Sequence, residues 1–223
     1  MFDPETGFIN QAFDADAVTP IQLDRLLEKG WRHFGTYFFR YNLGFYELDI
    51  REVIPLRIRL TDFSLSKSQR RNLRENADMR VKIGPIQITP EAEDLFDRHK
   101  RRFKNGVPAS IFDFLSQEPA HIPCDANQVA VFDSDRLVAV SYFDVGQTAC
   151  SGIYAMFEPE LARRGLGTFT MLKEIEFAAT SGKTFYYQGY TYSGNSFYDY
   201  KRRFRATECF DWRGNWRPLN GEG

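Results

Sequence analysis

A glycine-containing turn joins a predicted strand to a predicted helix in the second half of the chain. The turn is Ala162–Thr168, and it contains Gly165 and Gly167. Such a turn leaves backbone N–H groups pointing outward at the positive end of the helix, where a phosphate can bind. An aromatic and basic segment, Tyr186–Phe204, follows the helix. The order predicts an anion site close to hydroxyl and ammonium groups.

This turn resembles the coenzyme A loop of GNAT-fold acyltransferases. That loop has Gln or Arg, two residues, Gly, one residue, and then Gly or Ala. Gly165 and Gly167 match the two small residues, but Ala162 stands where Gln or Arg is expected. A plain strand-to-helix turn, in which glycine relieves steric crowding, explains the same residues. Taken alone, the turn favours this plain reading.

Several ordered motifs around the turn resemble the arginyl-tRNA–protein transferase family and its bacterial leucyl relatives. The matches are Gly30-Trp-Arg-His-Phe-Gly35, Ser66–Arg71, Tyr154, Phe157-Glu158-Pro159, Leu166-Gly167-Thr168, Gly189-Tyr190, Tyr200-Lys201, Phe204 and Trp216-Arg217-Pro218. The resemblance implies transfer of an amino acid of the arginine or leucine class from charged tRNA to the N-terminal α-amino group of a protein, as in N-degron tagging.

The candidate catalytic residues that follow from this resemblance are Lys201, Tyr198, Tyr190 and Gln188. An α-amino group has a pKa of about 7.7–8 and the ester is activated, so positioning and oxyanion stabilisation can supply most of the rate. Lys201 is predicted to place a charge near the ester or near an acidic acceptor side chain. The tyrosines are predicted to donate to the leaving ribose hydroxyl, and Gln188 points into the cleft if Tyr187 points away. No residue is assigned as the proton donor.

Transfer RNA binding requires neutralisation of phosphates, and three basic runs occur at Lys67–Arg74, Arg98–Lys104 and Lys201–Arg205. The predicted substrate- and tRNA-binding residues are Arg70, Arg71, Arg163, Arg164, Gly165, Gly167, Thr168, Tyr154, Tyr187 and Tyr200. We expect Arg70, Arg71 and Lys201 to face the same cleft as the glycines of the turn. A solvated helix face is the ordinary alternative for a charge run.

The chain departs from the family pattern at its cysteines. The family's N-terminal cysteine pair is absent, and its second vicinal pair falls on Val53-Ile54. Cys124, Cys150 and Cys209 are far apart and no CxxC occurs, so neither a zinc or iron–sulfur site nor a disulfide framework is predicted. We therefore expect no metal and no cofactor, with charged tRNA as the co-substrate.

Composition and charge agree with a folded enzyme. The 223 residues are 43% apolar and 16% aromatic, and the net charge is −1, which argues against disorder and against a polycation. We expect a cytoplasmic protein, because neither a signal peptide nor a membrane-spanning segment is visible. The expected partners are aminoacyl-tRNA and the N-termini of acceptor proteins, acidic ones among them, whereas the oligomeric state is not indicated. The three histidines are scattered and are predicted to be surface or structural residues.

The order of elements after Gln128 predicts a GNAT-like acyltransferase core. The predicted elements are a helix from Thr19-Pro20 to Gly30, strands Tyr37–Asp49 and Pro55–Phe63, helix Ser64–Met79, strand Ile83–Ile88, helix Pro90–Lys104, strands Val129–Phe132, Leu137–Val145 and Gly152–Phe157, a helix ending at Ser181-Gly182, and strand Lys183–Tyr190. We expect an α+β fold with a mixed central sheet flanked by helices. Residues 126–223 would form the catalytic region, and residues 1–125 an N-terminal α/β portion packed on it.

Two other functions fit the sequence. One is a GNAT N-acyltransferase that uses acyl-coenzyme A, which Ala162 disfavours. The other is a non-catalytic relative that binds RNA or protein N-termini, which agrees with the missing cysteines. Tyr198 replaces a family Met, and Phe197 replaces a basic residue of the bacterial relatives. The transferred amino acid and the accepted N-terminal residue therefore stay open.

Overall fold

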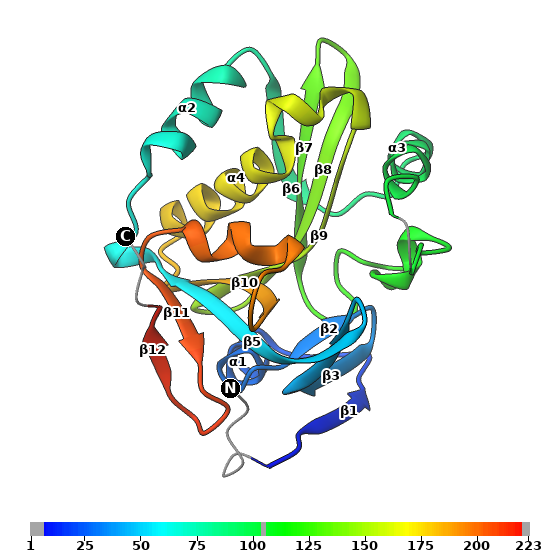
Figure 1. Cartoon of the computed structure of the whole chain (residues 1–223). Helices are drawn as coiled ribbons and strands as arrows, with labels where there is room; N and C mark the ends of the chain where they lie inside the picture. Colours follow the sequence, from blue (N-terminus) through cyan, green and yellow to red (C-terminus); the bar gives the residue numbers. More distant parts are fainter. Residues whose placement is uncertain (1–6, 104–105, 220–223) are drawn as a thin grey trace.

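The computed structural model describes residues 7–103 and 106–219 of the chain. Its centre is a mixed sheet with the strand order β12-β11-β5-β10-β9-β8-β7-β6, and β4 pairs with β5 outside this path (Figure 1). The strands are β4 (Leu43–Tyr46), β5 (Asp49–Arg59), β6 (Arg80–Pro85), β7 (Ala126–Asp133), β8 (Arg136–Val145), β9 (Ala149–Phe157), β10 (Phe185–Tyr192), β11 (Thr207–Phe210) and β12 (Trp216–Pro218). The β9–β10 pair is parallel, and the other pairs of this sheet are antiparallel.

Helices cover both faces of this sheet (Figure 1). The helices are α1 (Pro20–Glu28), α2 (Lys67–Glu75), α3 (Pro90–Lys100) and α4 (Leu166–Thr180). In Figure 1, α2 and α4 lie on one side of the sheet and α3 lies on the other. The buried apolar residues of α4 are Leu166, Phe169, Leu172, Ile175 and Ala178, and all five belong to one core cluster with residues of β8 and β9. Because they recur at every third position, their line turns gradually around the helix, and α4 is buried over more than one face. The end of α4 at Thr180 confirms the predicted helix end at Ser181-Gly182, and the sequence of elements confirms the predicted GNAT-like order.

The other helices bury smaller faces. Leu95 and Phe96 of α3 belong to an apolar cluster with residues of β8 and β9. Leu23 and Leu27 of α1 pack against a cluster that contains Tyr187 of β10. None of the helices in the described ranges has the length and apolar character needed to cross a membrane. α3 ends at Lys100, and residues 101–103 are not helical, so the helix is shorter than the predicted range Pro90–Lys104. Lys104 itself lies outside the described residues.

The N-terminal region contributes strands to two sheets. β1 (Asn10–Asp14), β3 (Tyr37–Tyr41) and β2 (Arg32–Phe34) form a small antiparallel sheet at the bottom of Figure 1. The predicted strand over residues 37–49 is divided into β3 and β4 at Asn42, whose buried amide binds backbone groups of the preceding segment. β5 and β6 belong to the central sheet. The boundary at residue 125 thus lies between the paired strands β6 and β7, and the division into two regions stays a prediction.

The basic helix is shorter than predicted. It occupies Lys67–Glu75 rather than Ser64–Met79. Ser66 and Gln69 exchange hydrogen bonds at its start, where Ser66 Oγ accepts from Gln69 N (3.2 Å) and Gln69 Oε1 accepts from Ser66 N (2.8 Å). This reciprocal cap satisfies two free amides and fixes the first turn. Asn76 ends the helix.

Candidate active site

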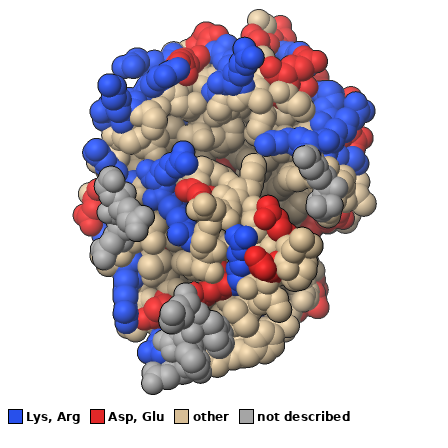
Figure 2. Space-filling model, in the orientation of Figure 1, with Lys and Arg blue, Asp and Glu red and all other residues tan. Residues whose placement is uncertain are grey.

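β9 and β10 pair over a short stretch and then separate. Their pairs are Phe185–Ala149, Tyr186–Cys150 and Tyr187–Ser151. The register of β10 against β5 shifts between Tyr187 and Gly189, so that Gln188 is the extra residue of a β-bulge. We call the space between the separated strands, bordered by the short helix η5 (Phe197–Arg203), the wedge. Figure 2 shows the surface hollowed just above η5.

Arg32 of β2 binds β9 where the two strands separate. Its guanidinium donates hydrogen bonds to Ser151 Oγ and to Gly152 O. These bonds place a fixed positive charge at the narrow end of the wedge and tie the small sheet to the central one. Arg is suited to this task because its planar fork can donate to two acceptors at once.

Lys201 of η5 lies beside this charge. Its Nζ donates to Tyr190 O (3.0 Å) and is 5.0 Å from the ring centroid of Tyr198. Burial, together with the smaller effect of the nearby Arg32 charge, lowers the pKa of Lys201 to about 7. Near neutral pH, Lys201 is therefore able to accept and release a proton.

Because Gly189 has no Cβ, the side chains of Lys201 and Arg32 can lie against the backbone of β10. Its φ is +87°, a conformation that glycine adopts readily. A Cβ at Gly189 would lie 3.3 Å from Lys201 Nζ and 3.7 Å from Arg32 Cζ. The glycine of the family's Gly-Tyr motif thus allows two cations to approach the β10 backbone.

A buried acid of α4 lies under the point where the strands separate. Glu174 is 3% exposed and accepts a hydrogen bond from Tyr186 OH. Burial raises the pKa of Glu174 to about 7, although the hydrogen bonds that it accepts oppose this rise. Gly152 makes room for the pair, because a Cβ there would lie 2.7 Å from Tyr186 OH.

We expect Glu174→Gln to remove a pH dependence of stability. Folding raises the pKa of Glu174 from 4.5 to about 7. Between these values the unfolded chain has lost a proton that the native chain keeps, so wild-type stability falls as pH rises, by roughly 3 kcal/mol. The amide does not titrate, so the variant should gain stability relative to wild type between about pH 4.5 and 7, measured by urea unfolding.

Glu176→Gln is the matched control, because Glu176 lies on the same helix, is exposed and pairs with Lys173 (2.8 Å). It should follow the wild-type pH dependence. A Glu174→Gln protein whose free energy of unfolding runs parallel to that of wild type would contradict the assignment.

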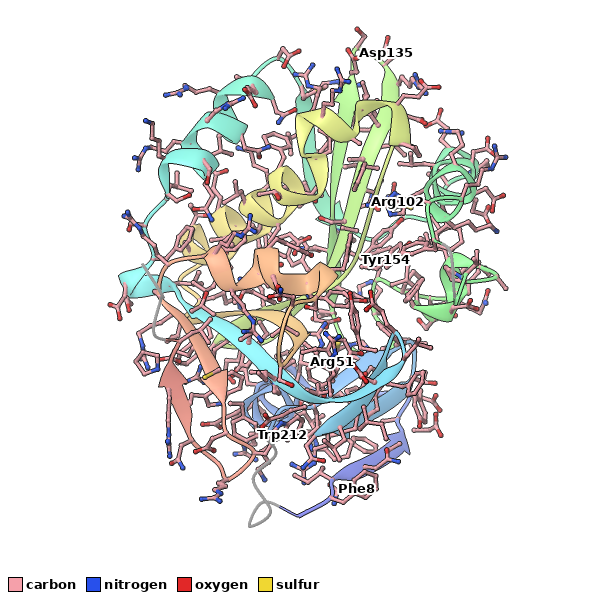
Figure 3. The ribbon with its side chains drawn as sticks, viewed as in Figure 1. Phe8, Arg51, Arg102, Asp135, Tyr154 and Trp212 are labelled. Carbon is pink, nitrogen blue, oxygen red and sulfur yellow. The ribbon has the colours of Figure 1, made fainter. Side chains whose placement is uncertain are left out.

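Arg102 borders the wedge from the side of α3. Its guanidinium carbon is 4.6 Å from the ring centroid of Phe157 on β9 and 5.9 Å from that of Phe197 on η5. Figure 3 shows Arg102 and Tyr154 between the central sheet and α3. A third cation therefore lies near the wedge, together with exposed and half-buried aromatic rings.

The structure brings together part of the predicted catalytic set. Lys201 and Tyr198 are neighbours in the wedge. Gln188 donates from Nε2 to Lys201 O (2.9 Å), so it holds the backbone of η5. Tyr190 donates its hydroxyl to Gly30 O (2.6 Å), which directs that hydroxyl to the N-terminal region. Lys201 and Tyr198 are thus the members of the set whose side chains meet.

The glycine turn contacts α2. Gly165 has φ +62° and precedes α4. Asn72 of α2 donates from Nδ2 to Arg164 O (2.9 Å), and a Cβ on Gly165 would lie 2.8 Å from this Nδ2. The Arg164 guanidinium binds Asn76 Oδ1 (3.0 Å) and Asp78. Arg164 is therefore engaged in fixing α2 to the turn, whereas Arg163 is exposed.

The remaining predicted binding residues lie in different surroundings. Arg70 and Arg71 are exposed on α2. Tyr154 stacks on Phe114 at 4.1 Å between ring centroids, and Tyr200 packs beside the α4 core. Gly167 and Thr168 form the first turn of α4.

One predicted binding residue needs correction. Tyr187 is 5% exposed, and its hydroxyl accepts a hydrogen bond from Arg57 (3.3 Å). Its ring packs at 5.5 Å from Trp216. Since Tyr187 is enclosed on the α1 side of the sheet, it is not available to bind tRNA.

Three residues of the site, Arg32, Glu174 and Arg102, were not predicted from the sequence. Arg32 lies inside the matched Gly30–Gly35 element, which was the available signal. Glu174 interrupts the buried face of α4 with a charge, and a buried acid in an apolar helix face is a recognised sign of a functional site. Arg102 carried no signal beyond its place in a basic run.

A mixed sheet whose parallel strands separate, with a glycine turn and a packed helix between them, defines a GNAT-like acyltransferase core. The chain belongs to the arginine-tRNA–protein transferase family. Residues 5–71 match the family's N terminus and residues 91–211 match its C terminus. It is an aminoacyltransferase that uses aminoacyl-tRNA and a protein acceptor.

Similar proteins agree with this assignment. The aspartate/glutamate leucyltransferase of Xanthomonas axonopodis pv. citri (strain 306) is 35% identical over 188 residues, which is 76% of this chain and 70% of the relative. The aspartate/glutamate leucyltransferase of Stenotrophomonas maltophilia (strain K279a) is 32% identical over 177 residues, with the same shares covered. A C-terminal domain described as that of a lysylphosphatidylglycerol synthetase from Agrobacterium fabrum superposes with a TM-score of 0.51 at 15% identity, over 83% of this chain and 55% of that one. This last likeness supports the fold alone.

Proposed function

We propose that the protein transfers leucine from charged tRNA to proteins that begin with Asp or Glu. The observation that carries the proposal is the similarity to relatives named aspartate/glutamate leucyltransferase. The fixed cations Arg32 and Arg102 beside the wedge would attract the carboxylate of an acidic N-terminal residue. The aromatic rings around them suit an apolar aminoacyl side chain. Such a product would be an N-degron made in the cytoplasm.

The proposed reaction forms an amide and breaks an ester. The lone pair of a neutral α-amino nitrogen attacks the carbonyl carbon of the aminoacyl ester and forms the new C–N bond. The tetrahedral intermediate then collapses, and the C–O bond to the ribose breaks. The nitrogen loses a proton and the leaving ribose oxygen gains one. Lys201, with its pKa lowered to about 7, is suited to accept the proton from nitrogen and pass it on.

Arg32 supports this step by charge. A tetrahedral intermediate places negative charge on the former carbonyl oxygen, and a fixed cation in a partly dry site stabilises such a charge strongly. The hydrogen bonds of Arg32 to Ser151 and Gly152 hold that cation at the narrow end of the wedge. Tyr198, beside Lys201, is the proposed donor to the ribose oxygen.

The test is transfer of radiolabelled amino acid from tRNA to synthetic peptides. Leucyl-tRNA should be used with peptides that begin with Asp or Glu, and much less with peptides that begin with Arg or Ala. Arginyl-tRNA should be a poor donor. Transfer from arginyl-tRNA at an equal or higher rate would refute the leucyl assignment, and transfer from acyl-coenzyme A without tRNA would refute the proposal as a whole.

The exposed arginines of α2 are expected to bind tRNA phosphates. The Arg70→Glu/Arg71→Glu double variant should bind any tRNA more weakly. The slope of log K, the association constant, against the logarithm of the salt concentration should be smaller in magnitude by about 2. Amino acid selectivity should not change, because phosphate contacts position rather than specify. Filter binding at several KCl concentrations measures both quantities.

Arg25→Glu on α1 is the control, because Arg25 is exposed and lies on a different helix. It should retain the wild-type salt dependence. If the double variant binds tRNA as wild type does, α2 is a solvated helix face and not an RNA-binding surface.

A further inference from the structure

Three potential metal ligands meet at a buried point beside the wedge. They are His33 of β2, Cys124 just before β7, and Asp144 of β8, and they are 5%, 4% and 1% exposed. His33 Nε2 is 3.1 Å from Asp144 Oδ1, Cys124 Sγ is 3.5 Å from the same oxygen, and Cys124 Sγ is 3.9 Å from His33 Nε2. Residues from three distant parts of the chain thus present one nitrogen, one sulfur and one oxygen to each other.

These separations match the edges of a tetrahedral zinc site. With bonds of about 2.3 Å to sulfur and about 2.0–2.2 Å to nitrogen and oxygen, the ligand atoms would lie about 3.3–3.7 Å apart. Each observed separation is within about 0.4 Å of this range. Small shifts of the side chains would therefore admit an ion between them.

The surroundings of the group support a metal site. His33 Nδ1 is 2.8 Å from Gly35 O, and a metal-binding histidine characteristically donates its other ring N–H to such a carbonyl. A cavity of about 10 Å³ adjoins the group and is lined by all of its three side chains. That volume is close to the minimum for one water molecule, which would supply a fourth ligand.

We propose that His33, Cys124 and Asp144 bind one divalent transition metal ion of the zinc class. The thiol proton of Cys124 would leave to solvent as the Sγ–metal bond forms. The ion would clamp β2 and the segment before β7 onto β8. Since Arg32 adjoins His33 on β2, the ion would also hold Arg32 in place at the wedge. The expectation of a metal-free protein rested on the lack of paired cysteines, and it did not consider ligands so far apart in the chain.

The test measures bound metal directly in the full-length protein. Protein is produced with added zinc or cobalt, purified without chelators and analysed by mass spectrometry of its metals. Wild type should carry about one ion per chain. Its cobalt form should show sulfur-to-cobalt charge-transfer absorption in the near ultraviolet. Cys124→Ser and His33→Gln should each lose most of the metal, and Cys124→Ser should lose the band.

Cys209→Ser and Cys150→Ser are the matched controls, because both residues are free cysteines outside the group. They should retain both metal and band. If Cys124→Ser does not fold, the two controls still assign the band to Cys124 by elimination. Wild-type protein with no bound metal after growth in either supplement would overturn the proposal, as would a charge-transfer band that survives in folded Cys124→Ser.

Discussion

Lys201→Met is expected to lower kcat/KM for aminoacyl transfer by about 10²–10⁴-fold, the range for loss of a general acid–base group. The side chain lies between Tyr190 O and the ring of Tyr198, and methionine preserves most of its volume. Binding of tRNA should change little, because Lys201 is proposed to act at the reacting ester and not to bind a tRNA phosphate. Single-turnover transfer to a peptide beginning with Asp, alongside tRNA binding, separates the two effects.

The pH dependence gives a sharper test of Lys201. With its pKa lowered to about 7, the fraction of neutral Lys201 rises with pH, so the wild-type kcat/KM should rise through that pH. The acceptor's own amine titrates at about 7.7–8. In Lys201→Met, the rise of kcat/KM near pH 7 should therefore disappear. The rise caused by titration of the acceptor's α-amino group should remain.

Lys183→Met is the matched control for Lys201. Lys183 precedes β10 at its other end, and its Nζ donates to Gly146 O (2.6 Å). This variant should keep the wild-type pH profile. Lys201→Arg should remain impaired, since arginine stays charged and cannot act as a base near neutral pH. Full activity of Lys201→Arg would show that Lys201 acts only as a fixed charge.

The sequence predicted the elements that depend on local pattern. The apolar stripe from Leu166 to Ala178 and the stop at Ser181-Gly182 are properties of neighbouring residues, and α4 is observed where both indicate it. The order of strand, turn, helix and strand was also predicted, but no residue pattern predicted the separation of β9 from β10, because no local signal distinguishes a strand that separates from one that pairs.

The sequence failed where strand alternation breaks. The prediction let Gln188 face the cleft if Tyr187 pointed away, as in a regular strand. The bulge before Gly189 makes Gln188 the extra residue, and its amide binds the backbone of η5 instead. A bulge depends on the register of β10 against β5, which lies more than 100 residues earlier in the chain. The residue pattern of β10 alone contains no information on its register with β5, so it cannot predict the bulge.

Long-range contacts account for the missed residues as well. Arg32 reaches Ser151 across 119 positions, and His33 reaches Cys124 across 91. Spacing rules for metal ligands and catalytic groups address residues close in sequence. The family element Gly30–Gly35 indicated that this segment matters, but only the topology of the two sheets shows which atoms it contacts.

Arg32→Gln is expected to lower kcat/KM at pH 7 by about 10²-fold. The variant loses the positive charge beside the reacting ester, and the residues that border the wedge are less well positioned. It should also move the acidic limb of the rate profile to higher pH. The Arg32 charge is one of the causes that lower the pKa of Lys201, so its removal raises that pKa and leaves less neutral Lys201 at pH 7. The measurement is kcat/KM for leucyl transfer from about pH 5.5 to 9.

Two further variants separate the charge of Arg32 from its hydrogen bonds. Ser151→Ala removes one acceptor and keeps the charge, so its rate limb should stay at the wild-type pH even if stability falls by about 1–3 kcal/mol. Arg40→Gln removes a cation of the neighbouring strand β3 that binds Gln11 (2.7 Å), and its profile should be unchanged. A limb that stays in place in Arg32→Gln, or moves equally in Ser151→Ala, would show that Arg32 does not act on Lys201 by charge. In that case Arg32 serves to hold β2 on β9, and the pKa of Lys201 is set by burial alone.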